Sequence, residues 1–298
     1  MKLPLYQIDA FTSRMFSGNP AAVVLLDAWL PDDALRAIAA ENNLAETAFV
    51  IRHGEVMPLR WFTPTVEVDL CGHATLAAAD VLFRHISPEA KRLVFSTRSG
   101  NLTVTRDGNL LSMDFPSRPG KPVEIEDTVV AALGVRPKEL YRARDLLAIY
   151  ESESEIRGFR PDFGRIASLD VLAVTISAPG EAVDYVYRFF APRQGIPEDP
   201  VTGSANCTLV PYWAARLGRS ELVAKQLSAR GGDLHCALRG DRVLIAGQAV
   251  EYLRGEITVD ASEPTRGCER SRASTPRSPR AFRRASRPRR TSIFSPTS

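Results

Sequence analysis

Two segments of this chain look like diverged copies of each other, and this repeat constrains the possible fold more than any other feature of the sequence. The first reads Cys-Gly-His-Ala-Thr at 71–75, and the second reads Asp-Pro-Val-Thr-Gly-Ser-Ala at 199–205. In both, an aromatic-x-Pro element comes shortly before, at 62–64 and at 190–192, and an apolar run follows. The repeat predicts two similar domains that each contribute half of one site.

Each copy lies where a helix is expected to begin. The first backbone N–H groups of a helix lack partners and the helix dipole is positive there, so such a segment can hold an anion such as a carboxylate. Gly72 and Gly203 would let the backbone approach the ligand, while His73, Asp199 and Ser204 would bring polar, proton-handling side chains beside it. The alternative is that Gly-His-Ala and Gly-Ser-Ala are ordinary helix caps, which the recurrence of the pattern disfavours.

Glu46 is the candidate acid/base among the carboxylates. It lies between the apolar segments 44–45 and 48–50, whereas most other glutamates lie in charged runs. Burial in a partly apolar cleft would raise the pKa of this carboxyl group toward the working pH, where a group that removes and returns a proton works best. The alternative is a surface glutamate at a helix end, which is the commoner situation for a single glutamate.

The other polar residues have supporting roles in this interpretation. His73 would donate to a substrate oxygen or carry the proton. Asp199 would orient His73 or bind a substrate amine or hydroxyl group. A histidine in this context is, on its own, more often a capping or packing residue. A nucleophilic role for Ser204 is disfavoured, because 203–205 lacks the second glycine of a nucleophile elbow.

Four separated motifs in this order resemble one known family. They are Asp-Ala-Phe-Thr at 9–12 with Phe-Ser-Gly-Asn-Pro-Ala-Ala-Val-Val at 16–24, Asn-Leu-Ala-Glu-Thr-Ala-Phe at 43–49, and the two copies described above. Over about residues 3–259 the chain resembles the phenazine biosynthesis PhzF-like isomerase family. The resemblance implies the α+β diaminopimelate epimerase-like fold, in which two similar domains each wrap a curved mixed β-sheet or barrel around a central helix.

The resemblance also implies a function. It implies a cofactor-independent isomerase, usually a homodimer, with its active site between the domains. The family's acid/base falls on Glu46, its supporting polar residues fall on His73, Asp199 and Ser204, and Gly72 and Gly203 line the cleft. In the best-known member the proton moves within a dihydro-hydroxyanthranilic acid, but that substrate does not carry over with the motifs. The expected substrate is a small carboxylic acid, a class that includes cyclic acids.

Of three alternatives, the first is disfavoured and the other two remain open. Two-thiol racemases of the same fold use one cysteine from each half, but here Cys71 is matched by Thr202, and a hydroxyl group cannot replace a thiolate as a base. An amino-acid racemase or epimerase using other bases is the second alternative. The third is a non-catalytic protein that binds a small acid in the cleft or nucleic acid through its tail.

The hydrophobic patterns and turn signals predict elements in both domains, 1–118 and 119–260, with a linker at 116–122. In the first domain they predict helices at 31–42 and 74–83, and strands at 5–11, 21–26, 60–63, 93–97, 102–106 and 110–115. In the second they predict helices at 129–133 and 205–216 and strands at 146–150, 171–176, 227–229, 234–239 and 242–246. Residues 247–259 resemble the closing strand pair of the family.

Composition and the absence of certain motifs narrow the classes of protein to which this chain can belong. The four cysteines and four histidines show no spacing typical of disulfide frameworks or metal sites, so no metal is expected. The sequence shows no nucleotide-binding fingerprint, no signal segment and no apolar run long enough for a membrane span. We therefore expect a soluble cytoplasmic protein without a cofactor.

The composition changes abruptly after residue 260. Residues 261–298 contain ten arginines, no lysine and two glutamates, a net charge of +8, which leaves −5 on residues 1–260. With few apolar residues, this tail is expected to be disordered. It has no counterpart in the family, and a shifted reading frame would produce such a composition. Nucleic-acid binding would depend on this tail alone and is disfavoured.

Overall fold

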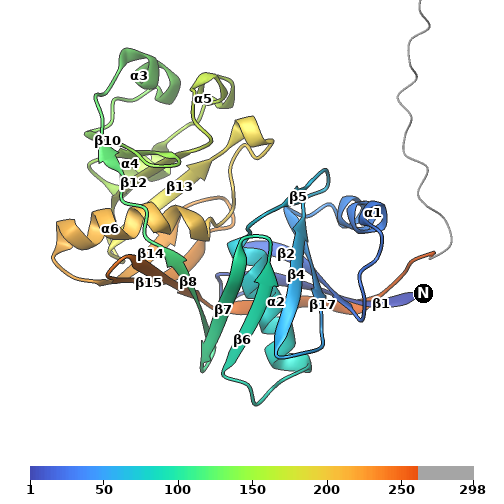
Figure 1. Ribbon diagram of the computed structural model, residues 1–298. Helices are drawn as coiled ribbons and strands as arrows, with labels where there is room; N and C mark the ends of the chain where they lie inside the picture. Colours follow the sequence, from blue (N-terminus) through green and yellow to red (C-terminus); the bar gives the residue numbers. More distant parts are fainter. Residues whose placement is uncertain (261–298) are drawn as a thin grey trace, which may run out of the picture. The chain divides into compact units, whose positions relative to one another are not determined.

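The structure is a computed structural model that describes residues 1–260, which belong to one unit (Figure 1). Hydrogen bonds join its seventeen described strands edge to edge into one connected sheet. Two antiparallel pairings link the two halves of the chain: β8 (Leu110–Pro116) pairs with β16 (Arg242–Gly247), and β1 (Lys2–Ala10) pairs with β17 (Ala249–Thr258). The last described strand therefore belongs to the sheet of the N-terminal half.

The N-terminal half is a curved mixed sheet around the helix α2 (Gly72–His85). Its other elements are β2 (Asn19–Leu26), α1 (Asp32–Asn42), β3 (Glu46–Ile51), β4 (Val56–Phe62), β5 (Glu67–Val68), β6 (Arg92–Thr97) and β7 (Gly100–Asp107). The pairs β2–β3 and β4–β6 are parallel, and the others within this half are antiparallel. Every residue from His73 to Phe83 is buried, as expected of a helix that is apolar on nearly all sides.

The C-terminal half repeats this plan around α6 (Asn206–Leu217), which follows the short 3-10 helix η2 (Gly203–Ala205). Its other elements are β9 (Lys121–Pro122), α3 (Asp127–Leu133), β10 (Glu139–Arg142), β11 (Leu146–Ile149), α4 (Glu153–Gly158), α5 (Phe163–Ser168), β12 (Val174–Pro179), β13 (Tyr185–Phe190), the 3-10 helix η1 (Pro192–Gln194), β14 (Glu221–Gln226) and β15 (Gly232–Arg239). Pro211 has no N–H for the Cys207 carbonyl one turn earlier, and Arg118 N donates to that carbonyl instead at 2.8 Å. This bond fixes the linker between the halves against α6.

The predicted α+β fold, with a curved mixed sheet around a central helix in each half, is confirmed, and both central helices lie where the sequence predicts them. Two smaller predictions are wrong. Residues 227–229 are not a strand, because Ser228 turns to donate to the Pro200 carbonyl at 2.7 Å. Residues 247–259 hold one strand and not a pair, because no turn interrupts β17 and its partner is β1.

The predicted domain boundary after residue 118 falls between β8 and β9 and stays a prediction. The predicted disordered tail, 261–298, lies outside the described residues. In residues 1–260, none of the helices has the length and apolar character needed to cross a membrane.

Candidate active site

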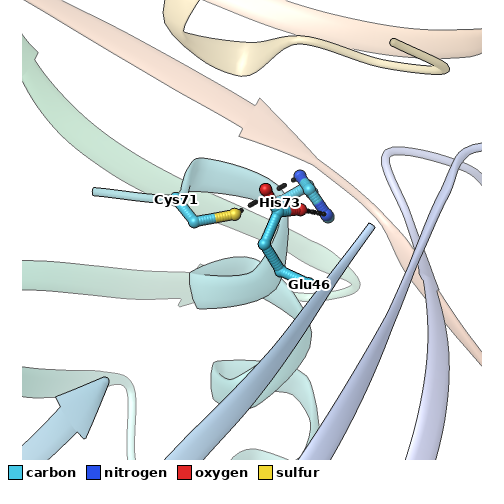
Figure 2. A group of neighbouring side chains, drawn as sticks. All are labelled: Glu46, Cys71 and His73. Carbon is cyan, nitrogen blue, oxygen red and sulfur yellow. Dashed lines mark hydrogen bonds and ion pairs between the residues drawn. The ribbon is translucent and has the colours of Figure 1, made fainter. Parts of the chain in front are cut away.

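Two predicted site residues, Glu46 and His73, meet where β3 and α2 begin (Figure 2). Glu46 Oε2 lies 3.0 Å from His73 Nε2. On the other side of the ring, Cys71 Sγ lies 3.5 Å from His73 Nδ1. The imidazole therefore stands between a carboxylate and a thiol, and each faces a different ring nitrogen.

The local sequence explains the position of His73. Cys71 is the N-cap of α2 and has an extended backbone, with φ −143° and ψ 113°. Thr75 donates to the Cys71 carbonyl through both its hydroxyl group and, at 3.2 Å, its backbone N–H. These bonds fix the first turn of α2, and with it the direction of the histidine side chain.

Asn19, the first residue of β2, joins this cluster to the C-terminal half. Its amide Nδ2 donates to Asp199 Oδ1 at 2.8 Å and to the Val201 carbonyl at 2.9 Å. The same nitrogen lies 3.3 Å from His73 Nδ1. The structure thus brings Glu46, His73 and Asp199 together, with Asn19 as the bridge between residues far apart in the sequence.

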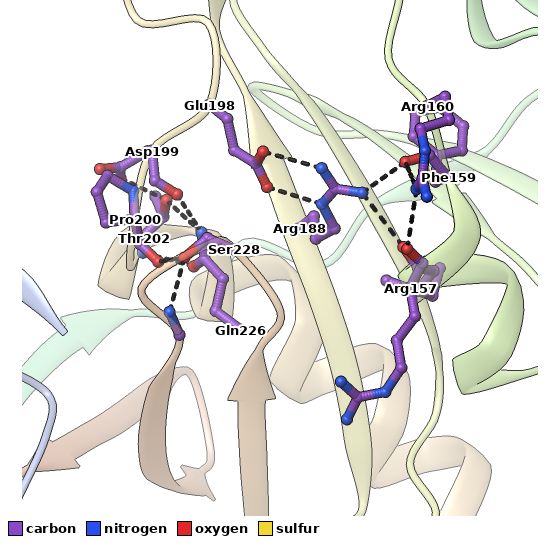
Figure 3. A network of polar contacts seen from close by, with 12 residues as sticks. Arg157, Phe159, Arg160, Arg188, Glu198, Asp199, Pro200, Thr202, Gln226 and Ser228 are labelled. Carbon is purple, nitrogen blue, oxygen red and sulfur yellow. Dashed lines mark hydrogen bonds and ion pairs between the residues drawn. The ribbon is translucent and has the colours of Figure 1, made fainter. Parts of the chain in front are cut away.

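The loop that carries Asp199 is fixed from β14 (Figure 3). Gln226 is fully buried and accepts from Thr202 N at 2.6 Å, while its Nε2 donates to the Asp199 carbonyl at 2.6 Å. The Thr202 hydroxyl group donates to Asp199 Oδ2. Just before this loop, Arg188 binds both carboxylate oxygens of Glu198, at 2.7 and 2.9 Å. Asp199 therefore has a fixed side-chain position as well as a fixed backbone.

The predicted rise in the pKa of Glu46 is wrong in direction. Burial raises the pKa of this carboxyl group, but the adjacent His73 outweighs burial and holds the pKa below its usual value. A second carboxyl group does show the predicted effect. Burial raises the pKa of Asp199 to about 6, although His73 and the Thr202 hydroxyl group act in the opposite direction. The site therefore holds two carboxyl groups with oppositely shifted pKa values.

Three polar atoms in this cluster are buried without a hydrogen bond: Glu46 Oε2, His73 Nε2 and Asn19 Oδ1. The 3.0 Å contact between Glu46 and His73 lacks the angles of a hydrogen bond, so both atoms keep capacity for another partner. An unsatisfied buried polar group costs roughly 1–3 kcal/mol, and several together indicate a place where a ligand supplies the missing partners.

The remaining predicted residues lie at the two helix starts, which are neighbours in the structure. Gly72 opens α2, and Gly203 opens η2 just before α6. A Cβ atom at Gly203 would lie 3.3 Å from the Phe11 ring, a tight contact, whereas one at Gly72 would make ordinary contacts. Ser204, in the middle of η2, is half-buried.

Glu46, Cys71 and His73 also offer one donor atom each within 4.8 Å of one another, the geometry of a possible metal triad. However, the thiol and the carboxylate face opposite nitrogens of the same ring. This arrangement suits proton exchange along the ring better than ligation of one ion by all three side chains.

Sequence reasoning missed Asn19 and Gln226 as parts of the site. Asn19 lies within the motif at 16–24, so its place in Gly-Asn-Pro was an available signal. Gln226 gave none, because a single glutamine at the end of a strand looks like any other polar residue. Its role follows only from the folded chain.

The chain matches known proteins over nearly all of its described length. The model of a family described as phenazine biosynthesis-like protein matches residues 8–255. An uncharacterized isomerase of Pseudomonas aeruginosa is 53% identical over 262 residues, covering 86% of this chain and 99% of that protein. The crystal structure of a PhzF-family phenazine biosynthesis protein from Enterococcus faecalis has a TM-score of 0.85 at 44% identity and covers 87% of this chain and 100% of that one. A predicted epimerase from Pseudomonas aeruginosa has a TM-score of 0.69 at 20% identity, covers 87% of this chain and 100% of that one, and shows the shared fold alone.

Proposed function

We propose that this chain, which belongs to the phenazine biosynthesis-like protein family, moves a proton within a small carboxylic acid. In this proposal Glu46 is the acid/base. Membership confirms the family predicted from the motifs, and the relatives named isomerases make this protein an isomerase. The substrate class and the role of Glu46 are the proposed part.

The observation that carries the proposal is the state of the Glu46 carboxylate. It is nearly buried, its pKa is lowered by His73, and Oε2 has no hydrogen bond. A carboxylate in this state is ionised at neutral pH and has a free lone pair. It can take a proton from a substrate carbon and return it to another, without a cofactor.

The neighbouring groups support this chemistry. His73 Nε2 adjoins the carboxylate and can donate to an oxygen on which negative charge develops. The helix starts at Gly72 and Gly203 can bind the substrate carboxylate through backbone N–H groups. Asp199, with its pKa of about 6, can hold a substrate amine or hydroxyl group or exchange a proton near neutral pH.

One observation favours epimerisation as a second candidate. Asp199 comes from the opposite half of the chain to Glu46, so two acid/base groups could flank one carbon atom, as inversion requires. Removal of a proton by one group and return by the other would then racemise an amino or hydroxy acid.

Deuterium exchange distinguishes these candidates. Wild type and Glu46→Gln are incubated in heavy water with a panel of small cyclic, amino and hydroxy carboxylic acids, and incorporation is followed by mass spectrometry and chiral chromatography. The proposal expects incorporation with isomerisation that depends on Glu46, whereas the second candidate expects incorporation with loss of chirality. Thermal stabilisation by an acid without any exchange would contradict both and indicate a binding protein.

A further inference from the structure

Trp61, on β4, has a buried donor without a partner. In residues 1–260, the buried side-chain nitrogen and oxygen atoms that lack a hydrogen bond are Asn19 Oδ1, Glu46 Oε2, His73 Nε2 and Trp61 Nε1. The first three belong to the candidate site, and the Trp61 side chain is only 1% exposed. A buried tryptophan normally has a partner for its N–H group, so an unsatisfied one indicates a place where a ligand supplies the acceptor.

Strand register puts Trp61 on the same face of the sheet as Glu46. Trp61 pairs with Ala48 of β3, and Glu46 lies two residues before Ala48. Paired residues, and residues two apart on a strand, point to one face, so the Trp61 and Glu46 side chains are diagonal neighbours. The Cβ atoms of such neighbours lie about 7 Å apart, within reach of an aromatic ring. This face is the inner one, because Ala48 and Trp61 belong to the core around α2.

The strand on the other side of Trp61 leads to the same site. Trp61 pairs there with Val68 of β5. Three residues after Val68 the chain reaches Cys71, the N-cap of α2, whose sulfur lies 3.5 Å from His73 Nδ1. Trp61 is therefore flanked by the strand that carries Glu46 and by the segment that leads to Cys71 and His73.

The surroundings of Trp61 favour an uncharged acceptor. Its partners on both neighbouring strands are apolar. Arg60, the cation next to it in the sequence, points to the other face, where it binds Glu67 at 2.7 Å. The His73 ring already pairs with Glu46. A buried carboxylate without a cation of its own is costly, whereas one hydrogen bond satisfies a carbonyl or hydroxyl oxygen.

We propose that Trp61 is a specificity-determining residue whose Nε1–H donates to a carbonyl or hydroxyl oxygen of the bound acid. The carboxylate of that acid binds elsewhere, at the helix starts. The site therefore prefers an acid with this second oxygen to the same acid without it. The consequence for turnover rests on the proposed function, whereas the binding preference does not.

Matched acids test the inference in the full-length protein. The probes are cyclohexanecarboxylate and its hydroxy and oxo derivatives at each ring position, with affinities measured by calorimetry. We expect at least one derivative to bind wild type roughly tenfold more tightly than the parent acid, which is the effect of one hydrogen bond to a buried donor. Trp61→Phe keeps an aromatic ring without the N–H group, so it should bind that derivative and the parent acid equally.

Nuclear magnetic resonance observes the donor itself. The chain has three tryptophans, so its indole N–H groups give three proton–nitrogen signals. Trp61→Phe assigns the signal of Trp61 by its loss. If that variant does not fold, Trp29→Phe and Trp213→Phe assign the same signal by elimination. We expect the Trp61 proton to move downfield when the preferred acid binds, while the Trp213 N–H, which donates to Ser177 at 3.0 Å, keeps its position.

Trp29→Phe is also the matched control for the binding measurement. It makes the same substitution at a side chain that is 37% exposed and lies against Arg60. This variant should keep the roughly tenfold preference of wild type, since it removes no donor from the inner face.

Two results would overturn the inference. One is a Trp61 signal that stays in place at the highest soluble concentration of every acid in the series. The other is a preference that survives in folded Trp61→Phe. Failure of the proposed function is a different outcome, because it would show as absent deuterium exchange in acids whose binding still depends on Trp61.

Discussion

Individual side chains in this site owe their proton affinities to partners that are distant in the sequence. Burial raises the pKa of Asp199 to about 6, whereas His73 lowers that of Glu46 despite burial. Two carboxyl groups with opposite shifts are typical of sites in which one group acts as the base and another as the acid. The sign of each shift predicts how stability depends on pH.

Asp199→Asn should become more stable relative to wild type as the pH rises. Between about pH 4 and 6 the folded protein keeps a proton on Asp199 that the unfolded chain has released, so ionisation of this group costs folding free energy as the pH increases. A shift of about two units corresponds to about 3 kcal/mol between pH 4 and pH 7. Urea unfolding of both proteins across this range measures the change, and a constant difference between them would contradict it.

Glu46→Gln should show the opposite slope in the same experiment. A carboxyl group with a lowered pKa contributes stability above its unfolded pKa and loses that contribution as the pH falls through the folded value. The variant should therefore lose most stability relative to wild type at neutral pH and least in acid. Equal slopes for the Asp199 and Glu46 variants would mean that the pKa assignments are wrong.

Among the elements, β14 positions the loop that carries Asp199 through one side chain, that of Gln226. Gln226 Oε1 and Nε2 satisfy the Thr202 N–H and the Asp199 carbonyl, both at 2.6 Å. This is the arrangement expected where a loop carries a functional group and a rigid strand fixes its geometry.

Gln226→Ala should destabilise the protein and, with it, loosen the loop that carries Asp199. It leaves two buried backbone groups without partners, which costs roughly 2–4 kcal/mol in the free energy of unfolding. Urea unfolding measures this cost, with Gln194→Ala as the control because Gln194 is exposed on η1. A stability equal to that of the control variant would show that other contacts, such as Ser228 with Pro200, suffice to position the loop.

The sequence predicted the elements and residues that carry a local signal. The apolar run after Gly72 indicated a buried helix, and the motif at 43–49 placed Glu46 in the site. The lowered pKa of Glu46 was not predictable, because it depends on the approach of His73 from another element. The role of Gln226 was missed for the same physical reason, since its hydrogen bonds join segments that only the folded chain brings together, whereas Asn19 lay within a recognised motif.

The molecule as a whole joins its halves by strand pairing and by the site itself. β8 pairs with β16, β1 pairs with β17, and Asn19 bonds to Asp199 across the two halves. Glu46 and His73 are only 9% and 6% exposed, so the junction of the halves shields both side chains from solvent. The homodimer and the cytoplasmic location implied by the sequence stay predictions.

Truncation after Asp260 should leave both stability and proton exchange unchanged. The described fold and all the residues of the candidate site lie within 1–260, and β17 ends at Thr258. Thermal unfolding and deuterium exchange of the truncated and full-length proteins test this expectation. Salt-sensitive nucleic-acid binding that disappears on truncation would instead assign a function to the basic tail.

The decisive measurement is the rate of deuterium incorporation from heavy water into a substrate acid by Glu46→Gln, together with the affinity of that variant for the acid. The account predicts a loss of roughly 10²–10⁴-fold in exchange, the usual contribution of general acid–base catalysis, with binding little changed because the two side chains have similar shapes. Glu89→Gln, at an exposed position, should exchange at the wild-type rate. A Glu46→Gln variant as active as the parent would contradict the assignment of Glu46 as the acid/base.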